Sequence, residues 1–170
     1  MNTAVNSHHR CDSGNKIITT ADCVESCIAT IARPLVFTNG CFDILHRGHV
    51  AYLEAAAKLG ASLVVALNTD ASVRRLDKSA NRPITSLDDR MAIIAALQCV
   101  DWVIAFDQDT PLELICLIRP DYLIKGGDWA TDAIVGADEV RSWGGHVHAI
   151  AVEFPRSTTD ILNRIRSSPG

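Results

Sequence analysis

Short apolar runs alternate with longer periodic segments along most of this chain. β-Branched and aromatic residues dominate the runs, so strands are predicted at 35–38, 63–67, 102–106, 122–124 and 147–152. Between them, apolar positions recur at helical spacing, so helices are predicted over 50–59, 70–76, 87–97, 131–143 and 157–166, with another opening at Thr110-Pro111. Strands that alternate with helices indicate an α/β fold. We expect a Rossmann-like, doubly wound parallel sheet of about five strands in three α/β/α layers.

Residues with capping chemistry mark several helix ends. Gly60 is expected to cap the helix over 50–59 at its C-terminus, and Asp70 to cap the next helix at its N-terminus. Ser86 and Asp89 have the spacing of a capping box. Pro111 fits the first turn of its helix, where a missing N–H is tolerated.

The N-terminal segment differs from the rest of the chain. Residues 1–16 are polar and are expected to form a flexible leader. Residues 17–34 have roughly helical apolar spacing that ends at Arg33-Pro34, so an N-terminal helix is predicted there. The main α/β domain is then expected to span 35–170.

The composition is that of one folded, soluble domain. The 170 residues are 48% hydrophobic and 21% charged, and the formal net charge of −4 argues against nonspecific adhesion to nucleic acid or anionic membranes. No apolar run is long enough for a membrane helix, and residues 1–16 do not resemble a signal peptide, so a cytoplasmic location is expected. In that compartment Cys99 and Cys116 are interpreted as small buried hydrophobes, whereas Cys23 and Cys27 could form half of a metal site that no second pair completes.

Unusual residues gather in the loops that follow three predicted strands, at 39–49, 125–129 and 155–159. Ligands of open parallel sheets bind at the carboxyl ends of the strands, where glycines and helix N-termini suit phosphate. His46 and His49 are three residues apart just before a helix, so both imidazoles could contact one phosphate chain. A metal site that combines them with Cys41 is a less favoured alternative, because no fourth ligand is nearby.

The run Thr38-Asn39-Gly40-Cys41-Phe42-Asp43, followed by His46-Arg47-Gly48-His49, resembles the nucleotide-binding motif of the HxGH nucleotidyltransferase superfamily. Residues 157–159 resemble the second phosphate-binding motif of its cytidylyltransferase-like branch, ISTT, although Arg156 stands in place of the isoleucine. Together with the stretches NRPI, VDWVIAFDQDTP and LIKGGDW, these motifs are most similar to the D-glycero-β-D-manno-heptose 1-phosphate adenylyltransferases. The resemblance covers about residues 35–166.

The resemblance implies transfer of AMP from ATP to a heptose 1-phosphate for lipopolysaccharide core biosynthesis, with Mg²⁺ bound to the nucleotide and no protein metal site. The implied catalytic residues are His46, His49 and Lys125. The implied nucleotide-binding residues are Thr38, Asn39, Gly40, Phe42, Gly48, Gly126, Asp128, Arg156, Ser157, Thr158 and Thr159. The implied sugar-phosphate contacts are Arg90, Lys78 and Asp43, of which Asp43 could instead orient its loop.

The family also implies partners. Its members often form the C-terminal half of a protein whose other half is a ribokinase-like sugar kinase, so a stand-alone form with a separate heptose kinase is expected, as is a homodimer or higher homo-oligomer. Two other functions remain open at this point: a cytidylyltransferase that acts on glycerol 3-phosphate or another phospho-alcohol, and a non-catalytic nucleotide-binding sensor. A flavodoxin-like redox protein is a weaker alternative.

Overall fold

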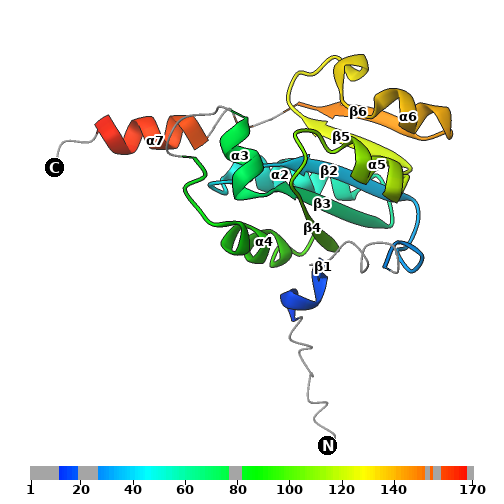
Figure 1. Cartoon of the computed structure of the whole chain (residues 1–170), viewed down its shortest axis with the longest axis horizontal. Coiled ribbons are helices and arrows are strands. Elements are labelled where there is room, and N and C mark those ends of the chain that lie inside the picture. Colours follow the sequence, from blue (N-terminus) through cyan, green and yellow to red (C-terminus); the bar gives the residue numbers. More distant parts are fainter. Residues whose placement is uncertain (1–11, 19–26, 77–81, 152–153, 155–157, 168–170) are drawn as a thin grey trace, which may run out of the picture.

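The computed structural model describes residues 12–18, 27–76, 82–151, 154 and 158–167. Its centre is a parallel sheet of six strands in the order β1-β4-β3-β2-β5-β6 (Figure 1). The strands are β1 (Ile17–Ile18), β2 (Leu35–Gly40), β3 (Ser62–Asn68), β4 (Trp102–Phe106), β5 (Tyr122–Gly126) and β6 (His146–Ile150). The α-helices are α2 (Arg47–Ala57), α3 (Asp70–Arg75), α4 (Leu87–Ala95), α5 (Leu112–Ile118), α6 (Ala137–Ser142) and α7 (Thr158–Ser167), and short 3₁₀ helices are η1 (Ser13–Lys16) and η2 (Thr131–Ala133). The predicted doubly wound α/β class is confirmed.

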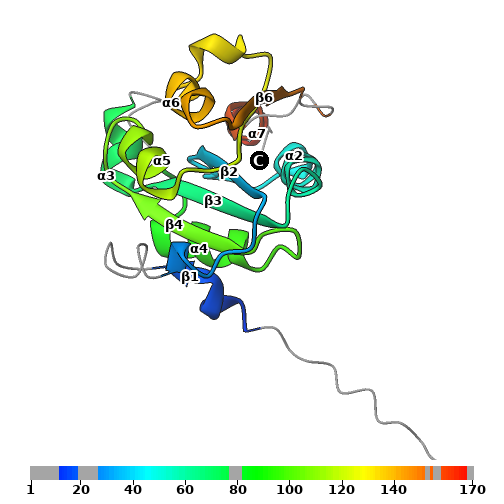
Figure 2. The same ribbon diagram turned by 90° about the vertical axis from the view of Figure 1, so that its right-hand side faces the viewer.

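Helices cover the sheet on both faces because alternate residues of each strand point in opposite directions. On β2, Leu35 and Phe37 join the core that includes α5 and α6, whereas Val36 joins the core that includes α2 and α4. Figure 2 shows α4 and α5 on opposite sides of the central strands. All seven residues of β3 are buried, as expected for a central strand of a parallel sheet.

The sixth strand corrects the prediction for the N-terminal segment. Ile17 and Ile18 pair with Val103 and Ile104 as β1, so they do not begin a helix. Lys16 in η1 donates from Nζ to the backbone oxygens of Leu97 (3.1 Å) and Val100 (2.7 Å), which ties the end of the predicted leader to the domain. Residues 1–11 and 19–26, where the rest of the leader and most of the predicted helix fall, lie outside the described residues.

One predicted helix cap is confirmed, and another is wrong. Ser86 caps α4, and its Oγ accepts from the backbone N–H of Asp89 (3.3 Å). The cap of α3 is Thr69 and not Asp70, because the Thr69 hydroxyl accepts from the N–H of Ser72.

Two glycines and one cysteine also behave differently from the predictions. The C-cap of α2 is Lys58, and Gly60 instead allows a close approach to Pro34, whose carbonyl oxygen would lie 2.3 Å from a Cβ. Gly136, at φ +88°, separates η2 from α6, so the helix predicted over 131–143 is interrupted. Cys116 is exposed, because Ile115 and Ile118 are the residues of α5 that face the sheet.

The chain order reverses between β2 and β5. From β2 the chain moves through β3 to β4 on one side, and β5 and β6 then lie on the other side of β2. The carboxyl ends of β2 and β5 therefore border a crevice of the kind that binds ligands in open parallel sheets. Within the described part of the chain, none of the helices is long and apolar enough to cross a membrane.

Candidate functional site

A cavity of about 470 Å³ opens at this reversal point. Its wall combines the end of β2, the first turn of α2, the end of β5 and the start of α7. Predicted site residues that line it are Asn39, Gly40, Phe42, Asp43, His46, Gly48, His49, Lys125, Gly126, Thr158 and Thr159. Residues from the three segments 39–49, 125–129 and 155–159 thus meet at one cavity, as their positions after the strands predict.

The two histidines lie against each other at the start of α2. His46 is the N-cap, and the ring centroids of His46 and His49 are 3.8 Å apart, with 19° between the ring planes. The ring of Phe42 contacts His49 from another side, at 5.1 Å between centroids. A Cβ on Gly48 would lie 3.0 Å from His46 Nδ1 and 3.1 Å from the Phe154 carbonyl oxygen, so glycine allows this compact arrangement.

His49 is neutral in the free protein at pH 7. Burial first, and the neighbouring His46 second, lower its pKa from 6.5 to about 4, against a hydrogen bond with the backbone of Ile44. Its buried Nδ1 has no hydrogen-bond partner among the described residues. Buried polar atoms rarely stay without a partner, and a bound anion would both provide one and raise the pKa of the imidazole.

Lys125 supplies a cation at the end of β5. Its Nζ donates to Asn39 Oδ1 at 3.2 Å, which places the ammonium group across the ends of β2 and β5. Behind it, the Tyr52 hydroxyl hydrogen-bonds with the buried Thr38 hydroxyl and donates to the Ile124 carbonyl oxygen at 3.2 Å. Burial raises the pKa of Tyr52, so the phenol stays protonated. Thr38 therefore does not line the cavity, and it supports the cavity wall through its hydrogen bond with Tyr52.

The start of α7 lines the same cavity as the two histidines. Thr158 is almost fully buried, and both Thr158 and Thr159 line the site. Their hydroxyl groups and the first N–H groups of a ten-residue helix suit an anion. Arg156 and Ser157 lie outside the described residues.

Asp43 is bound within the protein and serves the loop. Its carboxylate accepts from Arg82 Nε, from the N–H of Ile84 (2.7 Å) and from the N–H of Thr85 (2.9 Å). Burial alone would raise the pKa of Asp43, but these hydrogen bonds and the Arg82 charge hold it below its usual value. Of the two roles considered from the sequence, the structure supports orientation of the loop.

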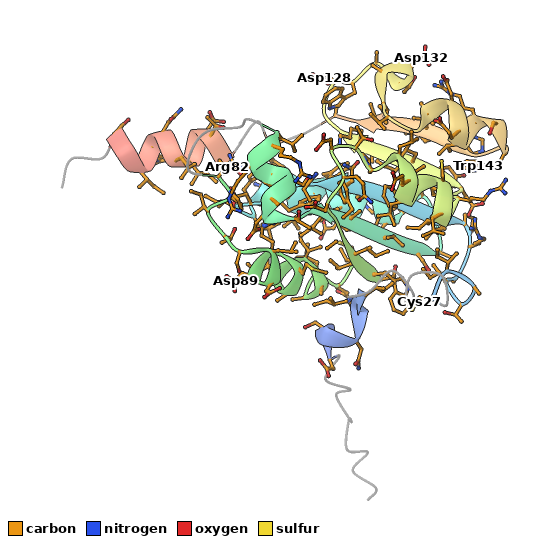
Figure 3. All side chains as sticks on the ribbon, in the orientation of Figure 1. Cys27, Arg82, Asp89, Asp128, Asp132 and Trp143 are labelled. Atoms are coloured by element: carbon orange, nitrogen blue, oxygen red, sulfur yellow. The ribbon has the colours of Figure 1, made fainter. Side chains whose placement is uncertain are left out.

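Arg90 does not line this cavity, so the structure does not place it at the predicted contact with the sugar phosphate. Its side chain is 0% exposed, and its guanidinium donates to Cys41 O (2.7 Å), Asp70 Oδ1 (2.7 Å) and Thr85 O (3.2 Å). Asp128 is exposed and absent from the lining, and Figure 3 shows it on the turn after β5, apart from Arg82. Lys78 lies outside the described residues.

Four lining residues were not assigned to the site by the sequence analysis: Cys41, Tyr52, Arg82 and Trp129. Arg82 and Trp129 belong to the quoted stretches NRPI and LIKGGDW, so the motifs contained them without indicating their role. Tyr52 has the spacing of an ordinary core residue of α2. Among the described residues no three His, Cys, Asp or Glu side chains are placed to hold a metal ion, so the Cys41, His46 and His49 alternative is not supported.

Comparison with known proteins identifies the family. The cytidylyltransferase-like family model matches residues 37–169. A D-beta-D-heptose 1-phosphate adenylyltransferase of Bordetella bronchiseptica is 55% identical over 153 residues, which cover 89% of this chain and 94% of that protein. The bifunctional protein HldE of Syntrophotalea carbinolica is also 55% identical, over 78% of this chain but only 27% of that protein.

Solved structures agree on the architecture. A lipopolysaccharide core biosynthesis protein of Thermoplasma volcanium has a TM-score of 0.59 and 30% identity, over 72% of this chain and 98% of that one. A pantoate-beta-alanine ligase of Francisella tularensis has a TM-score of 0.58 over 88% of this chain and 76% of that one, and at 13% identity it shows the fold alone.

Proposed function

This chain belongs to the cytidylyltransferase-like family, and we propose that it transfers AMP from ATP to a heptose 1-phosphate, giving ADP-heptose and pyrophosphate. The observation that carries the proposal is that His46, His49, Lys125 and Thr158 all line the same cavity. The 55% identity to a protein named for the heptose reaction favours that acceptor, and favours ATP over CTP. It also disfavours a non-catalytic sensor.

The reaction needs charge stabilisation more than proton transfer. A sugar phosphate has a second pKa near about 6, so its attacking oxygen is already ionised at neutral pH. That oxygen forms a bond to the α-phosphorus of ATP, the bond between the α-phosphorus and its bridging oxygen breaks, and pyrophosphate leaves with the electron pair. This chain therefore has to align two polyanions and stabilise the negative charge that develops.

We assign the resident groups to the phosphates by position. His46 and His49 hold the leaving pyrophosphate together with the start of α7, and Lys125 contacts the α-phosphate from the end of β5. Asn39, Gly40 and Phe42 form the wall beside the nucleotide. The backbone at Gly126 packs closely against the Tyr52 ring. A Cβ at this position would lie 3.2 Å from the ring, so glycine permits the contact.

We propose that Mg²⁺ enters with ATP and is held by phosphate oxygens and water, with few or no protein ligands. The donor set fits this mode, because the only carboxylate among the described lining residues is Asp43, which accepts from Arg82, Ile84 and Thr85. When bound, the ion would neutralise part of the phosphate charge.

We also propose a cytoplasmic homo-oligomer that works with a sugar kinase on a separate polypeptide. The chain spans about a quarter of the length of the bifunctional relative.

The test is to incubate the protein with Mg²⁺, each nucleoside triphosphate and a panel of sugar 1-phosphates, and to measure pyrophosphate. We expect release with ATP and a heptose 1-phosphate, and a decrease in turnover of at least about 10²-fold in His49→Ala, the typical effect of losing one such donor. His146→Ala, at an exposed histidine of β6, is the matched control and should keep wild-type turnover. Release with CTP alone, or normal turnover in His49→Ala, would overturn the proposal.

A further inference from the structure

A second cavity of about 290 Å³ adjoins the first. It lies at the carboxyl ends of β2, β3 and β5, between the segment 109–111 that follows β4 and the segment 133–135, and neither histidine lines it. Five residues line both cavities, and they form the boundary between them: Asn39, Gly40, Cys41, Lys125 and Trp129. A ligand in the second cavity can therefore reach the ammonium group of Lys125, beside the proposed position of the α-phosphate.

The wall of the second cavity is apolar with a few polar groups. Leu76, Pro111 and Ile134 supply hydrocarbon surface. Asn68 is almost fully buried, and its Nδ2 donates to Ser72 Oγ at 3.0 Å, which orients the amide. The Asp109 side chain is 76% exposed, and its Oδ1 accepts from Arg75 Nε at 2.8 Å. The Asn68 Oδ1 accepts from Cys41 Sγ at 3.7 Å, so the remaining Nδ2 hydrogen and the Asp109 carboxylate are the groups that can bond to ligand hydroxyls beside the apolar wall.

Trp129 adds a flat aromatic surface at the boundary. Its side chain is 52% exposed, although it lines both cavities. The turn at Gly127, with φ +114°, brings the indole so close that a Cβ at Gly127 would lie 3.3 Å from Nε1. The turn therefore presents the indole to the cavities.

A sugar ring matches this combination. Its hydroxyl groups can bond to a carboxylate and an amide, and its C–H face can pack against an indole. Ligand pockets usually measure about 300–1,000 Å³, so the second cavity suits a single ring better than a whole nucleotide. The sequence-based alternative for this role, Arg90, is buried beneath the loop and donates to three protein oxygens.

We propose that the second cavity binds the sugar ring of the acceptor, with Trp129 packed on the ring and Asp109 and Asn68 bonded to its hydroxyl groups. Its phosphate then lies at Lys125, beside the α-phosphate of ATP. The inference rests on the proposed function, because it places one of that reaction's two substrates.

Steady-state kinetics with each substrate varied in turn tests the assignment. We expect Trp129→Leu and Asp109→Asn each to raise the KM for heptose 1-phosphate by about tenfold or more, the usual effect of losing one such contact, and to leave the KM for ATP within about twofold. Asp107→Asn is the matched control, because Asp107 also pairs with Arg75 but does not line the cavity. It should leave both KM values unchanged.

The outcomes separate this inference from the proposed function. If wild type releases pyrophosphate but both cavity variants keep the wild-type KM for the sugar, or raise only the KM for ATP, the second cavity is not the acceptor site. If Asp107→Asn matches Asp109→Asn, the effect passes through Arg75 and the direct contact is refuted. If wild type turns over no sugar 1-phosphate, the proposed function fails. Quenching of tryptophan fluorescence by glucose 1-phosphate in wild type, absent in Trp129→Leu, would then support the sugar site, and its absence in wild type would refute it.

Discussion

Replacing Arg90 with methionine distinguishes a structural role from the sugar-phosphate contact that the family resemblance implies. The side chain lies under the loop that carries the histidines, and its three hydrogen bonds join that loop to the segment after residue 82 and to α3. Methionine fills much of the same space but cannot donate. Two carbonyl oxygens and the Asp70 carboxylate would lose their common donor.

The expected loss is large because the guanidinium is completely buried. Removing one partner of a buried ion pair typically lowers the free energy of unfolding by about 3–5 kcal/mol, and the lower end applies here because the remaining Asp70 carboxylate is 31% exposed. A domain of this size loses roughly 2–4 °C in Tm per kcal/mol, so a loss of about 3 kcal/mol should make Arg90→Met melt about 6–12 °C below wild type. Since whole domains are stable by only about 5–15 kcal/mol, the variant should remain folded near 20 °C but have little reserve.

Thermal and urea unfolding followed by circular dichroism measure this change, and kinetics at 20 °C measure the site. Arg74→Met is the control, because Arg74 is exposed on α3 and should change stability by less than about 0.5 kcal/mol. Arg90→Lys should fall between wild type and Arg90→Met, since one ammonium group cannot reach all three acceptors in the geometry of a planar guanidinium.

A direct phosphate contact has the opposite signature. If Arg90→Met unfolds at the wild-type midpoint while the KM for the sugar 1-phosphate rises tenfold or more, Arg90 binds substrate and its assignment as a buried support is wrong.

Three smaller changes test other parts of the site. The pKa of His49 is about 4 in the folded protein and 6.5 for an unperturbed histidine. The unfolded chain therefore binds more protons between these two pH values, and the free energy of unfolding falls as the pH falls from 6.5 to 4. His49→Gln should remove up to about 3 kcal/mol of this pH dependence, measured by urea titrations at pH 7 and pH 4, and an unchanged pH dependence would contradict the assignment. Gly48→Ala should displace the His46 ring and lower turnover, while its Tm changes by only a few degrees because helix propensity partly offsets the crowding; wild-type turnover would mean that the ring moves freely. Tyr52→Phe leaves the buried Thr38 hydroxyl with one partner fewer and should lower the free energy of unfolding by about 1–2 kcal/mol in urea, whereas a neutral result would show that the contact is weak.

Much of the architecture follows from local pattern, because strands and helices of this length have clear periodicity. The continuous apolar run over 63–67 predicts β3 within one residue at each end. The segment at Ile17 was misassigned because two apolar residues carry no period of their own, and only pairing with Val103 and Ile104 makes them a strand. Gly60 was misassigned for a similar reason, since its constraint comes from Pro34, 26 residues earlier in the chain.

The site was predictable where the chemistry is local and not where it depends on packing. His46 and His49 share one turn, so their spacing alone brought them together. Whether Arg90 points into the cavity or beneath the loop depends on Cys41 and Asp70, which come from other elements. Nothing in the spacing of Trp129 indicates that it separates two cavities.

Burial leaves the His49 ring at the anion site neutral at pH 7 in the free protein. A polyphosphate raises the pKa of His49 more than a monoanion does, because each negative charge beside the ring favours its protonated form. Affinity then grows more steeply than ligand charge, because each added phosphate also strengthens the cation that binds it. Monoanions therefore compete weakly with polyphosphates for this site, although nothing in the shape of the site excludes them.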